Sequence, residues 1–451
     1  MRCVLKVMCT AVFVVAVVAT PWLARAQAGG NDGSGYWGQW RGPLATGEAP
    51  RGDPPVEWSE SSNIRWKVPI PGLGSATPVV WGDRMFVLAA VPAGEEVASR
   101  DGIFRRIRNR FTRANSATRL QQFLVLALDR QDGSVIWQQV AREELPHEGI
   151  HQTGSYASGS AATDGEVLCA FFGSRGLYCY DLDGEPLWDV DLGDMRIRMG
   201  FGEGASPVLY RDLLIVVWDH EGDSFIAAFD KRTGEERWRT PRDEMTSWST
   251  PLVVEQGDDA QVITSATQGV RSYDVATGEI RWQDEGVTLN AIPSPVYEDG
   301  TVYVTSGYRG NRLAAIDLSA AKGNIAGSDA ILWSLDRDTP YVPSPLLHDG
   351  LIYLVKSNDG ILSSYDAGTG QRVWGPERIR ALRGVYASPV SASGRIYVPG
   401  RQGTTVVLQA GETFEVLATN ELDDGFDASP VVAGDELYLR GREFLYAIAE
   451  D

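Results

Sequence analysis

Short apolar runs with an alternating polar and apolar pattern recur along the whole chain. Residues 294–304 (SPVYEDGTVYV) contain two such runs around Asp299-Gly300, a dipeptide typical of tight hairpin turns. The alternation returns in residues 351–354 and 396–398. A period of two is that of half-buried β-strands. The pattern therefore predicts an all-β fold made of many short strands.

A Ser/Thr-Pro pair, or a near copy of it, opens eight of these strand-rich units. The pairs are Thr77-Pro78, Ser160-Ala161, Ser206-Pro207, Thr250-Pro251, Ser294-Pro295, Ser344-Pro345, Ser388-Pro389 and Ser429-Pro430. After the first interval the step is about 41–50 residues, the length of one four-stranded propeller blade. We therefore predict an eight-bladed β-propeller.

The end of each unit is its most regular part, with an Asp, a Gly four or five residues later and a closing Trp. Copies are ALDRQDGSVIW (127–137), AFDKRTGEERW (228–238), SYDVATGEIRW (272–282) and SYDAGTGQRVW (364–374). We expect the Asp to cap a turn, the Gly to take a positive φ and the Trp to lie between neighbouring blades. Trp188 and Trp333 fill the place in two more units, and Leu417 stands there in the seventh.

The eighth unit reaches the C-terminus after its third strand, residues 444–448, and leaves no room for a fourth. Residues 64–70 (IRWKVPI) resemble the Trp-bearing strand of the other units. We predict that they complete the last blade, with Trp66 as its docking ring. The propeller would then be closed by one strand from near the N-terminus.

The first 28 residues have the pattern of a cleaved export signal. Arg2 and Lys6 precede an apolar segment from Cys9 to Leu23, and small residues follow. This segment is short for a membrane span, and no Cys stands at the expected cleavage site for a lipid anchor. We expect a periplasmic or secreted protein with no membrane span. Residues 29–63 then form an N-terminal strap, whose Trp37 and Trp40 should pack against the side of a propeller that covers residues 64–451.

The net charge of −19 disfavours nucleic acid as a partner. One insertion in the first blade, residues 91–121, is instead basic, and Ile103, Ile107 and Phe111 favour a short amphipathic helix in it. It could bind an acidic partner, an anionic ligand or lipid head groups, or pair with carboxylates of the propeller. The candidate partner-binding residues are Arg105, Arg106, Arg108, Arg110 and Arg113.

Cys169 and Cys179 are the two cysteines outside the signal segment, on either side of a turn at residues 173–176. A strict four-residue turn pairs Cys179 with Ala170 and places the two thiols on opposite faces of the hairpin. This register favours two buried thiols, and a disulfide is the alternative.

The windows with Asp, Gly and Trp resemble the tryptophan-docking repeats of the pyrroloquinoline quinone (PQQ) dehydrogenases and of the barrel-assembly lipoprotein of the outer membrane. Other segments are similar to those of secreted PQQ-binding-like propeller proteins: YWGQWRGP (36–43), GSRGLYCYDLDG (173–184), FGEGASPV (201–208), WDHEGDSF (218–225) and YVPSPLL (341–347). The resemblance covers nearly the whole chain after the signal. It specifies the fold well and the function weakly, because propellers host unrelated activities.

Strand alternation sorts the loops into two faces. Turns such as Asp299-Gly300 lie on the bottom face, and the connections between blades lie on the top face. Ligands of quinoprotein propellers sit on the top face over the central channel, so the resemblance points there. The residues two before each opening pair enter the innermost strands from above: Ser75, Ser158, Gly204, Trp248, Ile292, Val342, Tyr386 and Asp427.

We interpret this rim as a pocket for a polar, ring-bearing ligand, and a polar channel mouth without a ligand is the alternative. Trp248 or Tyr386 would stack on the ligand, and Arg401 or Lys356 would bind a negative group. The candidate ligand-binding residues are Trp248, Tyr386, Asp427, Glu203, His220, Glu221, Asn290, Tyr341, Lys356 and Arg401.

His220, Glu221 and Asp223 come nearest to a reactive cluster. The His could act as a general base, or Glu221 and Asp223 could hold calcium. The alternative is a hydrogen-bonded loop with a solvated His. No Asp-rich segment follows to complete a calcium site, so we predict no metal centre.

The chain has no Cys-Cys pair like that of the quinone alcohol dehydrogenases and no Cys-x-x-Cys-His haem motif. This favours a non-enzymatic binding or scaffolding propeller of the cell envelope. We expect a monomer that requires no cofactor and binds an envelope protein or a small polar ligand. The alternative is a PQQ-dependent dehydrogenase for an alcohol or sugar, with PQQ and calcium on the top face. A third hypothesis is a role in outer-membrane assembly.

Overall fold

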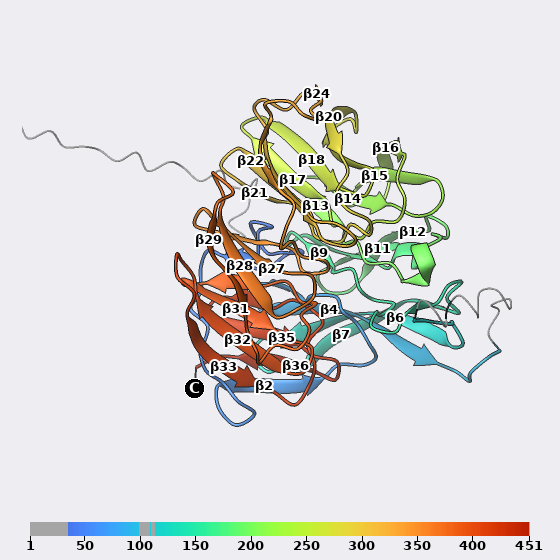
Figure 1. The fold of residues 1–451 in the computed structure, drawn as a ribbon. Coiled ribbons are helices and arrows are strands. Elements are labelled where there is room, and N and C mark those ends of the chain that lie inside the picture. Colours follow the sequence, from blue (N-terminus) through green and yellow to red (C-terminus); the bar gives the residue numbers. More distant parts are fainter. Residues whose placement is uncertain (1–34, 99–108, 110–112, 451) are drawn as a thin grey trace, which may run out of the picture.

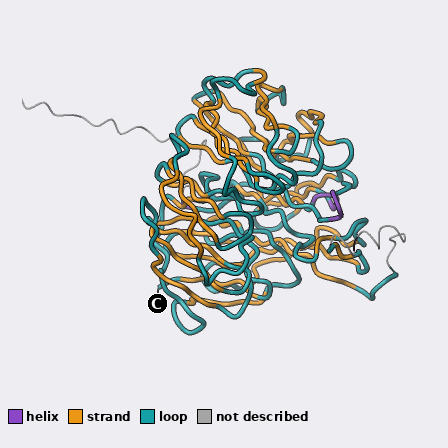
Figure 2. Tube along the Cα trace, in the orientation of Figure 1, coloured by secondary structure: helices purple, strands orange, loops and turns teal. Residues whose placement is uncertain are grey.

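Each unit of the repeat forms one antiparallel sheet, and eight such sheets make a β-propeller (Figure 1). The computed structural model describes residues 35–98, 109 and 113–450. Strands and loops make up nearly all of this part of the chain, with short 3-10 turns at η2 (Gly173–Arg175) and η3 (Arg198–Gly200) (Figure 2). The eight-bladed propeller expected from the repeat is therefore confirmed.

The first four blades follow the chain in order, from the innermost strand outwards. The first is β3 (Val79–Trp81), β4 (Arg84–Ala93), β6 (Leu120–Asp129) and β7 (Val135–Glu144). The second is β9 (Ala162–Thr163), β10 (Val167–Phe171), β11 (Leu177–Asp181) and β12 (Pro186–Val190). The third is β13 (Val208–Tyr210), β14 (Leu213–Trp218), β15 (Ser224–Asp230) and β16 (Glu236–Arg242). The fourth is β17 (Leu252–Gln256), β18 (Asp259–Ser265), β19 (Gly269–Asp274) and β20 (Ile280–Glu285).

The second half of the ring repeats this arrangement. The fifth blade is β21 (Val296–Glu298), β22 (Thr301–Ser306), β23 (Arg312–Asp317) and β25 (Ile331–Leu335). The sixth is β26 (Leu346–His348), β27 (Leu351–Val355), β28 (Ile361–Asp366) and β29 (Arg372–Arg378). The seventh is β30 (Val390–Ala392), β31 (Arg395–Pro399), β32 (Thr404–Gln409) and β33 (Val416–Glu421). The eighth is β34 (Val431–Ala433), β35 (Glu436–Arg440), β36 (Phe444–Ile448) and β2 (Ile64–Pro69).

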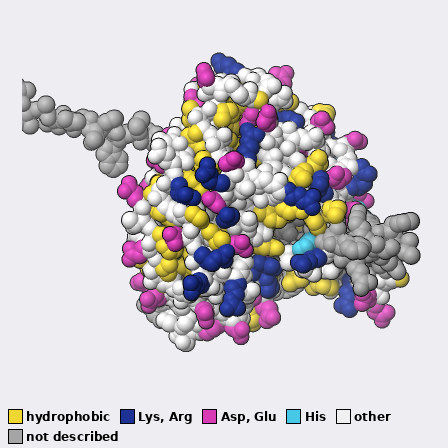
Figure 3. Space-filling view, viewed as in Figure 1, with side chains coloured by type: hydrophobic (Ala, Val, Ile, Leu, Met, Phe, Trp, Pro, Cys, Tyr) yellow, Lys and Arg dark blue, Asp and Glu magenta, His cyan; other side chains and the backbone are white. Residues whose placement is uncertain are grey.

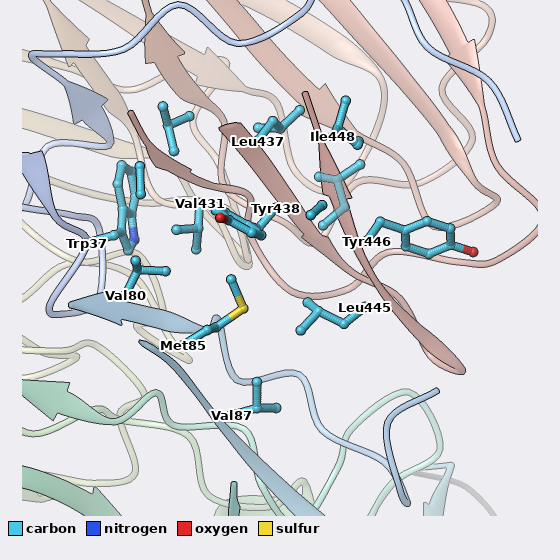
Figure 4. Packing of buried hydrophobic residues seen from close by; sticks show 14 of the residues in the cluster. Trp37, Val80, Met85, Val87, Val431, Leu437, Tyr438, Leu445, Tyr446 and Ile448 are labelled. Atoms are coloured by element: carbon cyan, nitrogen blue, oxygen red, sulfur yellow. The ribbon is translucent and has the colours of Figure 1, made fainter. Parts of the chain in front are cut away.

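The last blade closes as the sequence predicts, because β2 pairs antiparallel with β36. In Figure 1 the colours pass around the molecule from blue to red, and the blue β2 lies beside the red β36. Figure 4 shows the core between the first and last blades, where Met85 and Val87 face Val431 and Tyr438. The indole Nε1 of Trp66 donates to the carbonyl of Arg130 in the first blade at 2.9 Å.

The rings of most docking tryptophans pack against a motif glycine of the next blade. The indole N–H of Trp188 donates to the carbonyl of Lys231 at 2.9 Å, and that of Trp333 donates to Ala367 at 3.0 Å. The same bond joins Trp137 to Leu182, Trp238 to Val275 and Trp374 to Gly411. Gly370 has a φ of +69° and lies so close to Trp333 that a Cβ there would be 2.6 Å from the ring. Gly370 is therefore needed both for the positive φ of the turn and for the close approach of the Trp333 ring.

Two blades depart from this pattern, and the structure gives a reason for each. Strand β24 (Gly323–Asn324) pairs parallel with the outer edge of β20, and Trp282 donates within its own blade to Gln261. In the seventh blade, where Leu417 replaces the Trp, the strap supplies Trp58. This ring stacks on Tyr397 of β31 at a centroid distance of 6.3 Å.

The N-terminal strap crosses the bottom mouth of the channel, so the expectation that both of its tryptophans pack against the propeller's side is wrong. Trp37 bridges to Val80 of the first blade, and Trp40 Nε1 donates to Ser294 of the fifth blade at 2.9 Å. The guanidinium of Arg41 then bonds the carbonyls of Pro345 and Pro389, both at 2.7 Å. Strand β1 (Glu48–Ala49) adds in parallel to β30. The strap reaches across because its polar groups find partners in blades on both sides of the channel.

The two cysteines are joined by a disulfide, and the preference for free thiols is wrong. Cys169 and Cys179 are direct partners in the ladder between β10 and β11, with a Cα–Cα distance of 4.2 Å. The last pair before the turn is Phe171 with Leu177, so the loop holds one residue more than a strict four-residue turn. That residue shifts the register and brings both sulfur atoms to one face.

The basic insertion lies only partly within the described residues. Strand β4 continues to Ala93, and after the gap β5 (Ala114–Asn115) pairs with β8 (Ile150–His151) of the long connection before the second blade. The expected helix and Arg105, Arg106, Arg108 and Arg110 fall outside the described part of the chain. Among the residues that are described, no helix is long and apolar enough to cross a membrane.

Candidate functional site

A cavity of about 470 Å³ lies in the central channel, open towards the top face. All eight positions two before the opening pairs line it: Ser75, Ser158, Gly204, Trp248, Ile292, Val342, Tyr386 and Asp427. These residues converge because each blade begins its innermost strand at the same height around one axis. Of the candidate ligand-binding residues, Trp248, Tyr386, Asp427, Glu203 and Tyr341 line the cavity.

The lower part of the cavity is formed by the opening hydroxyls and closed by the strap. Ser206, Thr250, Ser294, Ser344, Ser388 and Ser429 line it together with Trp40. Neighbouring blades are tied here by amide-to-hydroxyl bonds, such as Ser344 N to Ser388 Oγ at 2.9 Å and Ser388 N to Ser429 Oγ at 2.8 Å. Ser429 N bonds Thr77 Oγ1 at 3.1 Å and ties the last blade to the first.

Aromatic rings form the upper wall. Trp248 is fixed by two bonds, from its Nε1 to the carbonyl of Gly202 at 2.7 Å and from its backbone N–H to Ala291 at 2.8 Å. Tyr308 and Tyr341 stack with centroids 4.7 Å apart. Asn290 does not line the cavity but donates to the Tyr341 hydroxyl at 3.3 Å. These rings are therefore held in place before any ligand enters.

The carboxylates of the cavity are both engaged by protein groups. Asp427 accepts from Arg401, and Arg442 donates to its Oδ2 at 3.0 Å. Arg401 also lies over the ring of Tyr386, 4.1 Å from its centroid. Glu203 accepts from the backbone and hydroxyl of Ser174, and burial raises the pKa of this carboxyl against those hydrogen bonds. The lining thus holds little free negative charge.

The pairing of β5 with β8 brings Arg113 and His151 to the mouth of the cavity. The Nδ1 atom of His151 accepts from the backbone of Thr153 at 3.3 Å, which assigns the ring proton to Nε2. Burial lowers the pKa of His151, and the positive charges of Arg113 and Arg401 lower it further. His151 is therefore a neutral hydrogen-bond donor near neutral pH.

Four other sequence candidates lie outside the cavity. His220 lies in a hydrogen-bonded loop, as the alternative interpretation has it, and its Nδ1 accepts from the backbone of Arg196 at 2.9 Å, but the side chain is buried and not solvated. Glu221 accepts from the Thr246 hydroxyl at 3.1 Å, and Lys356 pairs with Asp338 at 2.8 Å. Over the described ranges, no three His, Cys, Asp or Glu side chains group so that they could hold a metal ion, Asp223 included.

The sequence pattern missed several lining residues: Trp40, His151, Thr153, Phe201 and Tyr308. Tyr308 lies in the loop between the second and third strands of its blade, β22 and β23. The others lie in irregular connections without period, where no signal in the sequence marks them.

The described lining does not fit PQQ, a planar quinone with several carboxylates. Its rings could stack on the quinone, but Arg113 is the one Arg or Lys among the described lining residues. The neighbouring Arg401 and Arg442 are bonded to Asp427. A calcium ion would also need six or more oxygen ligands, and the two lining carboxylates are held by other groups.

Comparison with known proteins gives a family match over most of the chain. Residues 121–376 and 222–450 match the family described as "Outer membrane protein assembly factor BamB". A protein of that name from Yersinia pestis is 26% identical over 336 residues, which make up 71% of this chain and 78% of the relative.

Two solved structures share the fold. The crystal structure of BamB from Moraxella catarrhalis has a TM-score of 0.55 at 16% identity, covering 85% of this chain and 98% of that one. A europium-containing methanol dehydrogenase has a TM-score of 0.62 at 13% identity, covering 90% and 89%. At these identities the likeness supports the propeller fold alone.

Proposed function

Because the chain belongs to the family of the outer membrane protein assembly factor BamB, we propose that it is an exported, non-enzymatic binding scaffold of the cell envelope. The family match is the observation that carries this proposal. The pattern of an export signal in residues 1–28 agrees with a periplasmic location. The engaged carboxylates of the channel also offer no free base or metal ligand set for catalysis among the described residues.

We place the partner site on the top rim, where the basic insertion leaves the first blade. Arg105, Arg106, Arg108, Arg110 and Arg113 would meet an acidic surface on an envelope protein, and attraction between opposite charges would steer the encounter. The pairing of β5 with β8 supports this placement because it holds Arg113, a residue of the insertion, beside the cavity mouth. The Yersinia pestis relative suggests outer membrane protein assembly as the process served.

Deleting the gene in its own bacterium tests the proposal. We expect lower levels of folded outer-membrane β-barrel proteins, measured by their heat-dependent mobility on gels, and recovery with the wild-type gene. A variant with Arg105, Arg106, Arg108 and Arg110 all changed to Glu should not restore these levels. The control changes Arg211 and Arg232, two exposed arginines of bottom turns, to Glu. This control should restore the levels of the barrel proteins fully. Unchanged barrel levels in the deletion strain would show the assembly role to be wrong.

The alternative function, a PQQ-dependent dehydrogenase for an alcohol or sugar, predicts a different result. Purified protein titrated with PQQ and calcium would bind the quinone in the micromolar range and reduce a dye with a substrate. If the wild type bound the quinone and Arg401→Ala did not, the scaffold proposal would be wrong and the dehydrogenase hypothesis would take its place. We expect no dye reduction, because the described lining holds one cation, Arg113, for the several carboxylates of the quinone.

A further inference from the structure

The lower cavity presents a ring of hydroxyl groups with hydrogen atoms still available. Each of these oxygens already accepts the amide hydrogen of the preceding blade: Ser206, Thr250, Ser344, Ser388 and Ser429. A Ser or Thr hydroxyl has one O–H to donate besides its lone pairs. No acceptor for these five hydrogens is found among the described residues. All five side chains are buried, so an oxygen-rich guest would satisfy donors that are costly to leave unpaired.

The upper cavity adds flat, rigid rings above these donors. Trp248, Tyr386 and the stacked pair of Tyr308 and Tyr341 surround it. The face of an aromatic ring carries negative charge and attracts weakly positive C–H groups. A pyranose ring combines both requirements, since it has one face of C–H groups and an edge of hydroxyl oxygens.

The charges of the cavity select against a strongly charged guest. Asp427 is bonded to Arg401 and Arg442, and Glu203 is bonded to Ser174. Arg113 and the Nε2–H of His151 are further donors at the mouth. Dark blue and magenta side chains are interspersed over the face shown in Figure 3, without one large patch of a single sign. A neutral guest therefore matches this lining better than a polyanion.

We propose that the central cavity binds a neutral saccharide of one or two rings, held between the aromatic wall and the hydroxyl ring, with Trp40 as its floor. A volume of about 470 Å³ lies within the range of small-ligand pockets, ~300–1,000 Å³. It is too small for a folded partner. This binding is separate from the scaffold role and can fail or succeed without it.

The test titrates the purified, full mature protein with four probes: glucose, N-acetylglucosamine, maltose and N,N′-diacetylchitobiose. Calorimetry and the fluorescence of the cavity tryptophans report binding. We expect saturable binding of at least one probe and a loss of at least tenfold in affinity for both Tyr308→Ala and Tyr386→Ala. Both rings are half-buried in loops, so these variants should fold.

The matched control is Tyr36→Ala, which removes a half-buried tyrosine that packs on Trp81 at the bottom face. It should bind the probe as the wild type does. Absence of saturable binding for all four probes would overturn the proposal, and so would binding that the two cavity variants leave unchanged. A protein that binds PQQ but none of the sugars would also overturn it. Melting temperatures of all variants separate lost binding from lost folding.

Discussion

The indole Nε1 of Trp40 donates a 2.9 Å hydrogen bond to the hydroxyl of Ser294, and this bond makes the strap part of the ring at the channel centre. The other opening hydroxyls accept from the amide of the preceding blade, as Ser344 does from Ser294 at 3.0 Å. The hydroxyl of Ser294 accepts from Trp40 instead. A segment that precedes the propeller in sequence therefore closes its channel from below.

Replacing Trp37 by Ala should cost more stability than replacing Trp40 by Ala. Trp37 is 1% exposed and packs between the first and last blades, so the loss should be ~3–5 kcal/mol, as for large buried rings. Trp40 is only partly buried, and its loss should be about 1–2 kcal/mol, chiefly from one hydrogen bond and part of the ring surface. Urea unfolding followed by circular dichroism measures both. Equal losses would contradict the different burial of the two rings.

Gly350 and Gly370 have nearly the same φ, so comparing their substitution by Ala distinguishes the cost of turn strain from the cost of lost ring packing. Gly350 has a φ of +71° with open space around it, whereas Gly370 has a φ of +69° and lies against Trp333. We expect Gly350→Ala to cost about 1–2 kcal/mol from strain alone. Gly370→Ala should cost a further ~1–3 kcal/mol, because its Cβ would displace the docked ring. Chemical unfolding of the two variants side by side decides this, and similar losses would show that the ring contact is unimportant.

The fold was predictable because its signals are local and repeated. The opening pairs and the windows with Asp, Gly and Trp depend on contacts within one blade or with the next blade, so each copy carries its own evidence. The same regularity placed all eight positions such as Trp248 and Asp427 around one cavity. Strand alternation and a constant step were sufficient for that part of the site.

The remainder of the site depends on segments without a repeat. Trp40 reaches the channel through a strap whose hydrogen-bond partners lie in at least six of the eight blades, and no local pattern encodes such a crossing. Arg401 is one of the candidate ligand-binding residues, but its bond to Asp427 depends on side-chain geometry that the sequence pattern does not encode. For Cys169 and Cys179 a single extra loop residue reversed the expected faces.

The disulfide between Cys169 and Cys179 should stabilise the second blade. Both residues are fully buried, and their bond closes a short loop, so the double variant Cys169→Ala, Cys179→Ala should lose roughly 2–3 kcal/mol. A reducing agent should lower the melting temperature of the wild type and leave the double variant unchanged. Labelling of the denatured, unreduced mature protein with a thiol reagent provides the direct check. Two labelled thiols per chain would contradict the bond.

Acid should weaken the turn of the third blade through Asp230. The hydrogen bond from Arg237, helped by those from Arg232 and Thr233, lowers the pKa of this carboxyl to about 2. A depressed pKa means that the stabilisation is fully present above the pKa of the unfolded chain, near 4, and is lost as the pH falls towards 2. Because the ion pair is at the surface, its contribution should be below about 1 kcal/mol.

We therefore expect Asp230→Asn to melt slightly below the wild type at pH 7 and to match it near pH 2. The variant Arg237→Ala should reduce the same difference, since it removes the largest cause of the shift. Melting curves from pH 7 to pH 2 measure this, and a gap between wild type and Asp230→Asn that is independent of pH would contradict the assignment.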